Sequence, residues 1–258
     1  RSPGKIEYLA STVYSDDFVF YPDSVSAKGS RASIAEKQFG SVLFPQASLP
    51  KYQMKWFPKQ DQMKIRNTDV PFNFYDSTAQ FTGTLTISKS GVAAIGKLET
   101  RGSELRSRQM NFSGKDFSAR HANFRAKSGD STTPLIDGTD VRVKFNLEKN
   151  YADISPEIEG VAAIDFPFAQ FKTSIPKAQW DLNTQKITMT KNPDVPIENS
   201  YFYTTRKDLD SLAFNAEKAV YDLKTQEMLV SGIPYITVAD ARITPENGQV
   251  SILAHQRL

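Results

Sequence analysis

The 258-residue chain contains no cysteine and only two histidines, and these scarcities exclude several kinds of chemistry. Without cysteine the chain cannot form disulfides, use a thiolate nucleophile or bind a metal through sulfur. The histidines, His121 and His255, lie far apart, and neither has a second histidine or a patterned set of carboxylates near it in sequence. We therefore predict no metal site and no cofactor.

Long apolar runs and catalytic motifs are also missing. No stretch of about 18 apolar residues occurs, so we expect no transmembrane segment. The sequence has no Gly-x-Ser-x-Gly nucleophile motif, no phosphate-binding loop and no dinucleotide fingerprint. Carboxylates such as Asp16, Asp61 and Asp208 could in principle include the pair that a glycosidase needs, but Asp at a strand end usually forms a turn. We predict that the protein is not an enzyme.

An excess of charge of one sign is missing too, because 32 basic residues face 29 acidic ones and the net charge is +3. This excess is too small to indicate a nucleic-acid partner. With 39% hydrophobic and 24% charged residues, the composition is that of a folded protein that does not span a membrane. The chain begins at Arg1 and has no signal-like apolar segment, which is typical of a mature, trimmed or excised piece of a polypeptide.

Residues that favour β-strands are plentiful. The chain holds 17 Phe and 10 Tyr, and apolar residues alternate with polar ones through most of its length. Strand-like segments recur about every 8–12 residues without intervening helices, which argues against a doubly wound α/β fold. Near residues 30–40, Ser33 and Glu36 have the spacing of a capping box, so we predict one short helix there, with a loop as the alternative.

The C-terminal half contains a repeated strand–corner–strand unit. Its two best copies carry an aromatic residue, an Asp-Leu pair and a Thr-Gln pair at identical offsets. The best copies are residues 178–187 and 219–228, and weaker copies are residues 143–152, residues 241–250 and a segment that starts near Tyr201. Such self-similarity indicates repeated supersecondary units, and the alternative is a set of ordinary hairpins that share turn residues. In either case Asp181 and Asp222 are expected to form corners.

These patterns predict an all-β fold with little helix: an elongated β-roll, a jelly roll or a solenoid built from repeated strand–corner–strand units. In such a fold each unit buries its apolar face against its neighbours. We expect an N-terminal β region at 1–127, which includes the short helix, and a C-terminal repeated β region at 128–258. The two regions could also form one continuous domain.

The segment from Lys89 to Lys127 is locally basic, with nine positive and three negative side chains. Its arginines are the candidate ligand-binding residues: Arg101, Arg106, Arg108, Arg120 and Arg125. Arg106 and Arg108 are two residues apart and therefore share one face of a strand. Such a face could hold phosphate or anionic lipid headgroups. The alternative is a solvated sheet face that its charges keep soluble and unpaired.

Aromatic residues offer a second kind of candidate site. Tyr201 and Tyr203 are two apart and share one strand face, for which packing in the core is the default explanation. An open groove lined by such side chains would bind acyl chains or sugar rings. Trp56 and Trp180 are likewise either sugar-stacking platforms or core residues.

The repeat also carries a resemblance to a known family. Ala216–Leu223 followed by Met228–Gly232, and more weakly Lys177–Leu182, match a unit in which an Ala-x-x-Ala-x-Tyr-Asp strand precedes a polar corner and a second apolar strand. This ladder is similar to the OstA-like lipopolysaccharide-transport family of β-jelly-roll proteins, over about a third of the chain. The resemblance implies an envelope protein with an open, V-shaped β-roll that shelters acyl chains and stacks end to end with like domains.

Our first expectation is therefore a non-enzymatic β domain of the bacterial cell envelope, in the periplasm or at the cell surface, which binds or bridges lipid or glycolipid. Its partners would be lipid or glycolipid and other envelope proteins or like domains. A closed, solidly packed interior would argue against it. The first alternative is a structural or adhesion scaffold domain of a larger surface or envelope protein, which predicts a filled core and an exposed sheet edge. The second is a carbohydrate-binding or carbohydrate-active module.

Overall fold

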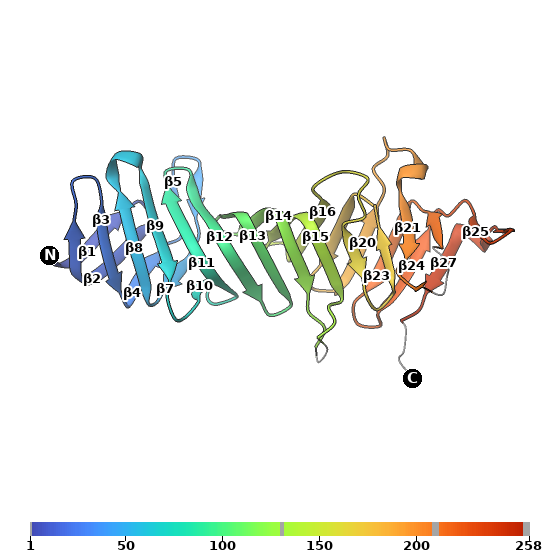
Figure 1. The fold of residues 1–258 in the computed structure, drawn as a ribbon, viewed down its shortest axis with the longest axis horizontal. Coiled ribbons are helices and arrows are strands. Elements are labelled where there is room, and N and C mark those ends of the chain that lie inside the picture. The colour runs from blue at the N-terminus through green and yellow to red at the C-terminus, as the bar shows by residue number, and fades with distance from the viewer. Residues whose placement is uncertain (1, 130–131, 208–211, 255–258) are drawn as a thin grey trace. The chain divides into compact units, whose positions relative to one another are not determined.

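The computed structural model describes residues 2–129, 132–207 and 212–254, and the candidates His255 and Asp208 lie outside these ranges. The described residues form 27 strands and no α-helix, as expected for an all-β protein (Figure 1). Their short 3-10 turns are η1 (Pro58–Gln60), η2 (Ile197–Asn199) and η4 (Glu246–Gly248). The chain divides into two compact units, unit 1 (Arg1–Ala119) and unit 2 (Arg120–Leu258), and the division falls eight residues before the expected boundary.

Unit 1 consists of short and long antiparallel strands. They are β1 (Ser2–Tyr8), β2 (Ser11–Phe20), β3 (Val25–Gly29), β4 (Arg31–Ile34), β5 (Lys37–Phe39), β6 (Val42–Phe44), β7 (Ala47–Leu49), β8 (Tyr52–Phe57), β9 (Gln62–Asn67), β10 (Phe72–Phe74), β11 (Ala79–Ser88), β12 (Gly91–Thr100), β13 (Ser103–Phe112) and the start of β14 (Asp116–Ala126). The short strands form two rows that both run from β2 to β11. One row is β3–β8–β9 and the other is β4–β7–β10.

The long strands β2 and β11 each serve both rows, and this closes the roll of unit 1. Residues 11–14 of β2 pair with β4, whereas Val19 and Phe20 pair with β3. In the same way residues 79–81 of β11 pair with β10, and residues 84–87 pair with β9. Alternate side chains of both rows therefore meet in one interior, where Phe74 stacks on Phe112 with ring centroids 4.4 Å apart.

A pair of glycines marks the place where β11 passes from one row to the other. Gly83 lies directly opposite Gly96 of β12, and both have positive φ angles, 149° and 158°. A Cβ atom on either residue would lie 2.9 Å from Cζ of Phe81 and within 3 Å of the opposite backbone. Only glycine provides this conformation and this close approach, so the bend depends on the pair.

The helix predicted near residues 30–40 is wrong, because β4 and β5 occupy this segment. Ala32 and Ile34 are both buried, and their spacing of two is that of a strand. Strands β2 and β7 hydrogen-bond to the two edges of β4. This non-local pairing outweighs the local capping signal of Ser33 and Glu36.

Unit 2 is built from shorter strands. They are β15 (Ile136–Asn146), β16 (Tyr151–Pro156), β17 (Ile164–Phe166), β18 (Phe171–Thr173), β19 (Lys177–Asp181), β20 (Lys186–Thr190), β21 (Tyr201–Thr204), β22 (Ala213–Asn215), β23 (Lys218–Asp222), β24 (Glu227–Ser231), β25 (Ile236–Val238), β26 (Ala241–Ile243) and β27 (Gln249–Ile252). Row A is β15–β16–β19–β20–β23–β24–β27. Row B is β15–β17–β18–β21–β22–β25–β26.

The repeated corners of row A confirm the roles predicted for Asp181 and Asp222. Oδ1 of Asp181 accepts hydrogen bonds from the backbone N–H groups of Asn183 (2.8 Å) and Thr184 (3.0 Å). Asp222 accepts in the same way from Lys224 (2.9 Å) and Thr225 (3.3 Å). These hydrogen bonds from backbone N–H groups are the main cause of the lowered pKa values of both carboxyls.

The fourth residue after Asp181 is Gln185 and the fourth after Asp222 is Gln226, and both have a φ angle of +61°. Asn150 holds the corresponding position in the copy at 143–152, with a φ angle of +53°. Consecutive corners are joined, because the N–H of Leu182 donates to the carbonyl of Asn150 and that of Leu223 to the carbonyl of Gln185, both at 3.0 Å. The copies at 143–152, 178–187 and 219–228 are thus one repeated structural unit, stacked side by side.

Two of the weaker copies differ. Residues 241–250 do not form a hairpin, because β26 pairs with β25 in row B whereas β27 pairs with β24 in row A. The copy near Tyr201 belongs to row B, where β21 pairs with β18 and with β22. Both segments share turn residues with the repeat but not its pairing, since the pairing depends on strands that are distant in sequence.

Aromatic side chains fill the interior of unit 2. Phe124, Phe145 and Trp180 lie together with centroids 6.2–6.3 Å apart. Further along the rows, Phe166 packs edge-on against Tyr221 at 5.0 Å. All five side chains are at most 2% exposed, so this part of the roll has a packed aromatic core.

Candidate functional site

The arginines predicted to bind a ligand are divided between the two units. In unit 1, Arg101 lies in the turn after β12, and Arg106 and Arg108 are exposed on β13. Nε of Arg106 lies 2.7 Å from Oε1 of Glu104 on the same strand. In unit 2, Arg125 is bonded to Asp137 at 3.3 Å and Arg120 to Glu157. Carboxylates therefore offset much of this positive charge.

Glu157 is the most constrained of these carboxylates, with a side chain only 3% exposed. It accepts hydrogen bonds from Arg120 and lies 3.3 Å from Nε of Arg142. Next to it, Nδ1 of His121 lies 2.9 Å from Oδ1 of Asp140. The hydrogen bond from Arg120 is the main cause of the lowered pKa of Glu157. This cluster of ion pairs links β14, β15 and the end of β16.

The aromatic candidates prove to be mainly structural. Trp180 is 2% exposed and lies in the core of unit 2, so it cannot stack on a sugar. Trp56 is half-buried and packs against Tyr8, with ring centroids 5.5 Å apart. Tyr201 and Tyr203 are half-buried neighbours, with centroids 6.1 Å apart.

The far end of unit 2, formed by β25, β26 and β27, was not predicted as a site. Phe214 is buried in the interior and pairs with Ile236, which pairs in turn with Ile243, so all three side chains face the interior. Val238 is on the same face as Ile236, two residues on. Yet Ile243 is 50% exposed and Val238 45% exposed, because no further strand of the described residues covers them.

Row A also ends in a strand whose inward-facing apolar side chains are only partly covered. Val250 and Ile252 of β27 pair with Val230 and Met228, whose side chains are fully buried. Val250 and Ile252 themselves are half-buried. The interior of unit 2 therefore ends in an apolar layer, and β26 and β27 each have one edge without a strand partner among the described residues. We call this surface, formed by Val238, Ile243, Val250, Ile252 and the two free edges, the open end.

The open end could have been found from sequence only in part. The alternation of Ile236, Thr237 and Val238 indicates an amphipathic strand. Its position as the last layer of a roll depends on pairings between distant segments.

The part of the chain that the structure describes holds no cluster of three or more metal-ligating side chains and no helix capable of crossing a membrane. No protein-family model matches the sequence, and neither a curated protein nor a solved structure is significantly similar to it.

Proposed function

We propose that this chain is a non-enzymatic β-roll segment of a bacterial envelope assembly, and that it extends a scaffold by adding another β-roll segment at its open end. The observation that carries this proposal is the open end itself. Among the described residues, two rows of strands both end there with edges that have no strand partner, and an apolar layer lies between them. Exposed edges and apolar patches of this kind are the elements through which sheets add strands.

The occupant of the open end would be a segment of the same architecture, for which a second copy of this chain serves as the probe. A β-roll partner can supply two edge strands at the spacing of rows A and B and an apolar layer between them. A single peptide strand could satisfy only one of the two edges. The envelope location rests on the resemblance to OstA-like proteins alone.

A role in bridging other envelope segments is better supported than a role in enclosing an acyl chain within the roll. The interiors of both units are occupied by buried aromatic side chains, such as Phe74 and Phe112 in unit 1 and Phe145 and Trp180 in unit 2. A lipid chain would have to displace these side chains, which are close-packed. Native mass spectrometry of protein from a bacterial host is therefore expected to show the mass of the protein alone. A lipid-sized mass released on denaturation would favour enclosure instead.

Self-association tests the proposal directly. Sedimentation velocity of the wild-type chain over a range of concentrations should show reversible association. The double variant Val238→Lys/Ile243→Lys should weaken it by at least about tenfold, since it places two charges in a surface that is dehydrated on contact. The matched control Ile95→Lys/Val161→Lys changes two exposed apolar residues elsewhere and should associate like the wild type. A wild-type chain that stays monomeric at millimolar concentration would contradict the proposal.

A further inference from the structure

The outer face of β3, β8 and β9 in unit 1 carries a concentration of positive charge. Because side chains alternate along strands, four exposed cations point outward: Lys28, Lys55, Lys64 and Arg66. Residues next to them on the opposite face are buried, such as Met54 and Ile65. Cross-strand pairing places Lys55 directly opposite Lys64, and Gln53 lies between Lys28 and Arg66. Four cations thus lie on three adjacent strands.

None of these four cations forms an ion pair with a described residue, in contrast to Arg106, Arg120 and Arg125. The ammonium of Lys55 does lie 5.1 Å from the ring centroid of Phe57, two residues along the strand. Like charges that face each other across two strands destabilise a sheet. A bound anion would relieve this repulsion.

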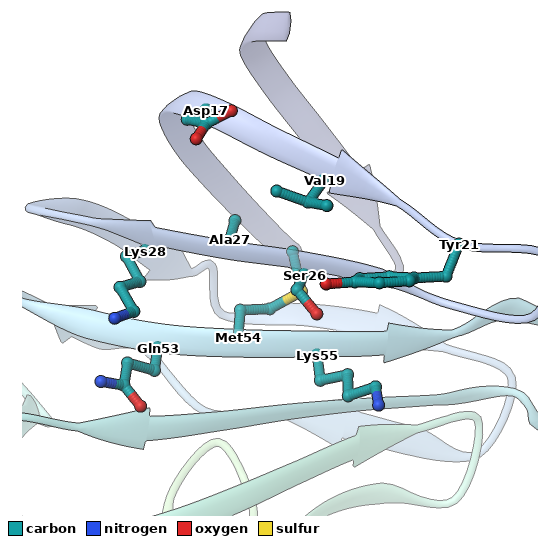
Figure 2. Close-up of a pocket in the computed structure, with 9 residues that line it drawn as sticks. All are labelled: Asp17, Val19, Tyr21, Ser26, Ala27, Lys28, Gln53, Met54 and Lys55. Atoms are coloured by element: carbon teal, nitrogen blue, oxygen red, sulfur yellow. The ribbon is translucent and has the colours of Figure 1, made fainter. Parts of the chain in front are cut away.

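Beside these cations the face is hollowed into a cup of about 540 Å³. Its lining includes Lys28 and Lys55, the polar side chains of Ser26 and Gln53, and the side chains of Val19 and Tyr21. Figure 2 shows the Tyr21 ring extended along the cup toward Ser26, with Lys28, Gln53 and Lys55 on the strands below. We call this surface, together with the adjacent Lys64 and Arg66, the cationic cup.

Tyr21 is 53% exposed, and its backbone is fixed in a turn. Its backbone N–H donates to the carbonyl of Ser24 at 2.8 Å and closes the turn between β2 and β3. The ring is therefore presented to solvent from a fixed corner. An exposed aromatic face beside polar and charged groups is a combination that holds an amphipathic ring in a defined orientation.

We propose that the cationic cup binds an anionic polysaccharide chain. The pyranose ring would pack its C–H face on Tyr21 and Val19, and its carboxylate or sulfate groups would accept charge-assisted hydrogen bonds from Lys28 and Lys55. Ser26 and Gln53 would bond the ring hydroxyls. Lys64 and Arg66 would contact the anionic groups of the next sugar, since they continue the positive face onto β9.

The lining of the cup favours a saccharide over an acidic peptide. Beside its cations the cup exposes the uncharged side chains of Val19 and Tyr21, which the C–H face of a sugar ring can cover and a dense row of peptide carboxylates cannot. An anionic polysaccharide alternates charged groups with uncharged ring surface, and the lining offers lysines for the first and apolar side chains for the second. This inference is independent of the open end, which belongs to unit 2.

Calorimetric titration of the full chain tests the proposal. The probes are a carboxylated oligosaccharide (oligogalacturonate), its neutral methyl-esterified form, and an oligoglutamate of equal charge. Wild-type protein should bind oligogalacturonate, with an affinity that falls as salt is raised. It should bind oligoglutamate at least about tenfold more weakly, equal to about 1.4 kcal/mol, and the neutral sugar more weakly still.

Variants locate the site. Lys55→Gln/Lys64→Gln should weaken oligogalacturonate binding by about tenfold or more, and Tyr21→Ala should weaken it without changing the weak oligoglutamate binding. The control Lys144→Gln/Lys177→Gln removes the same charge from exposed positions of unit 2 and should bind like the wild type. Unchanged binding in the cup variants, equal binding of oligoglutamate, or no binding of oligogalacturonate at millimolar concentration would each overturn the proposal.

Discussion

At the residue scale, half-buried Tyr75 and fully buried Tyr221 show how hydrogen bonding decides what a hydroxyl contributes to stability. The hydroxyl of Tyr75 lies 2.8 Å from the carbonyl oxygens of Ser113 and Asp116, to which it donates. The hydroxyl of Tyr221 is buried without a protein hydrogen-bond partner among the described residues. Burial raises the pKa of both phenols.

We expect Tyr221→Phe to leave the free energy of unfolding unchanged or to raise it by up to about 1 kcal/mol, because the substitution removes an unsatisfied polar group. Tyr75→Phe should lower it by about 1–2 kcal/mol, because the carbonyls of Ser113 and Asp116 lose the hydroxyl donor that they share, although Asp116 keeps the N–H of Ser113. Urea unfolding followed by circular dichroism measures both. A larger loss in Tyr221→Phe than in Tyr75→Phe would show that Tyr221 has a partner.

The residue scale also shows what sequence can predict. Asp181 and Asp222 were identified as corner formers because their partners are two and three residues away, within the same motif. The partner of Arg120 is Glu157, 37 residues distant. The neutralisation of the predicted basic segment therefore could not be read from local pattern, and neither could the cationic cup, which combines residues of four strands.

At the element scale, the bend in β11 depends on Gly83 and Gly96. We expect Gly83→Ala to lower the free energy of unfolding by about 2–4 kcal/mol, since the new methyl group meets the opposite backbone and the Phe81 ring at a backbone angle that alanine disfavours. Gly129→Ala is the control, because its Cβ would meet no atom within 4 Å, and we expect a change below about 0.5 kcal/mol. Equal urea midpoints for the two variants would contradict this role of Gly83.

The elements were predictable where the pattern is strong along the chain. Alternation of apolar residues predicted the strands and the repeated corners of row A correctly. The segment 30–40 and the copy at 241–250 were assigned wrongly for a common reason. In both, the neighbouring strands in space come from elsewhere in the sequence, and hydrogen bonding to those strands determines the conformation.

At the scale of the whole molecule, stability in acid depends on carboxyls whose pKa is lowered in the folded state. Glu157, Asp181 and Asp222 all lie in unit 2, where hydrogen bonds from arginine or from backbone N–H groups stabilise their charged forms. A carboxyl whose folded pKa is depressed adds stability above its unfolded pKa of about 4, and this stability is lost as the pH falls through the folded value. Asp165 acts in the opposite direction, because burial raises its pKa.

We therefore expect unit 2 to lose more stability than unit 1 as the pH falls below about 4. The chain provides one tryptophan in each unit, Trp56 and Trp180, so fluorescence of Trp180→Phe reports unit 1 and that of Trp56→Phe reports unit 2. Between pH 7 and pH 3 the urea midpoint should fall further for unit 2. Glu157→Gln should reduce this difference, because it removes one of the titrating groups while leaving an oxygen for Arg120. If the midpoints of the two single-tryptophan variants that keep Glu157 shift equally, acid acts through the net charge of the whole chain rather than through these three carboxyls.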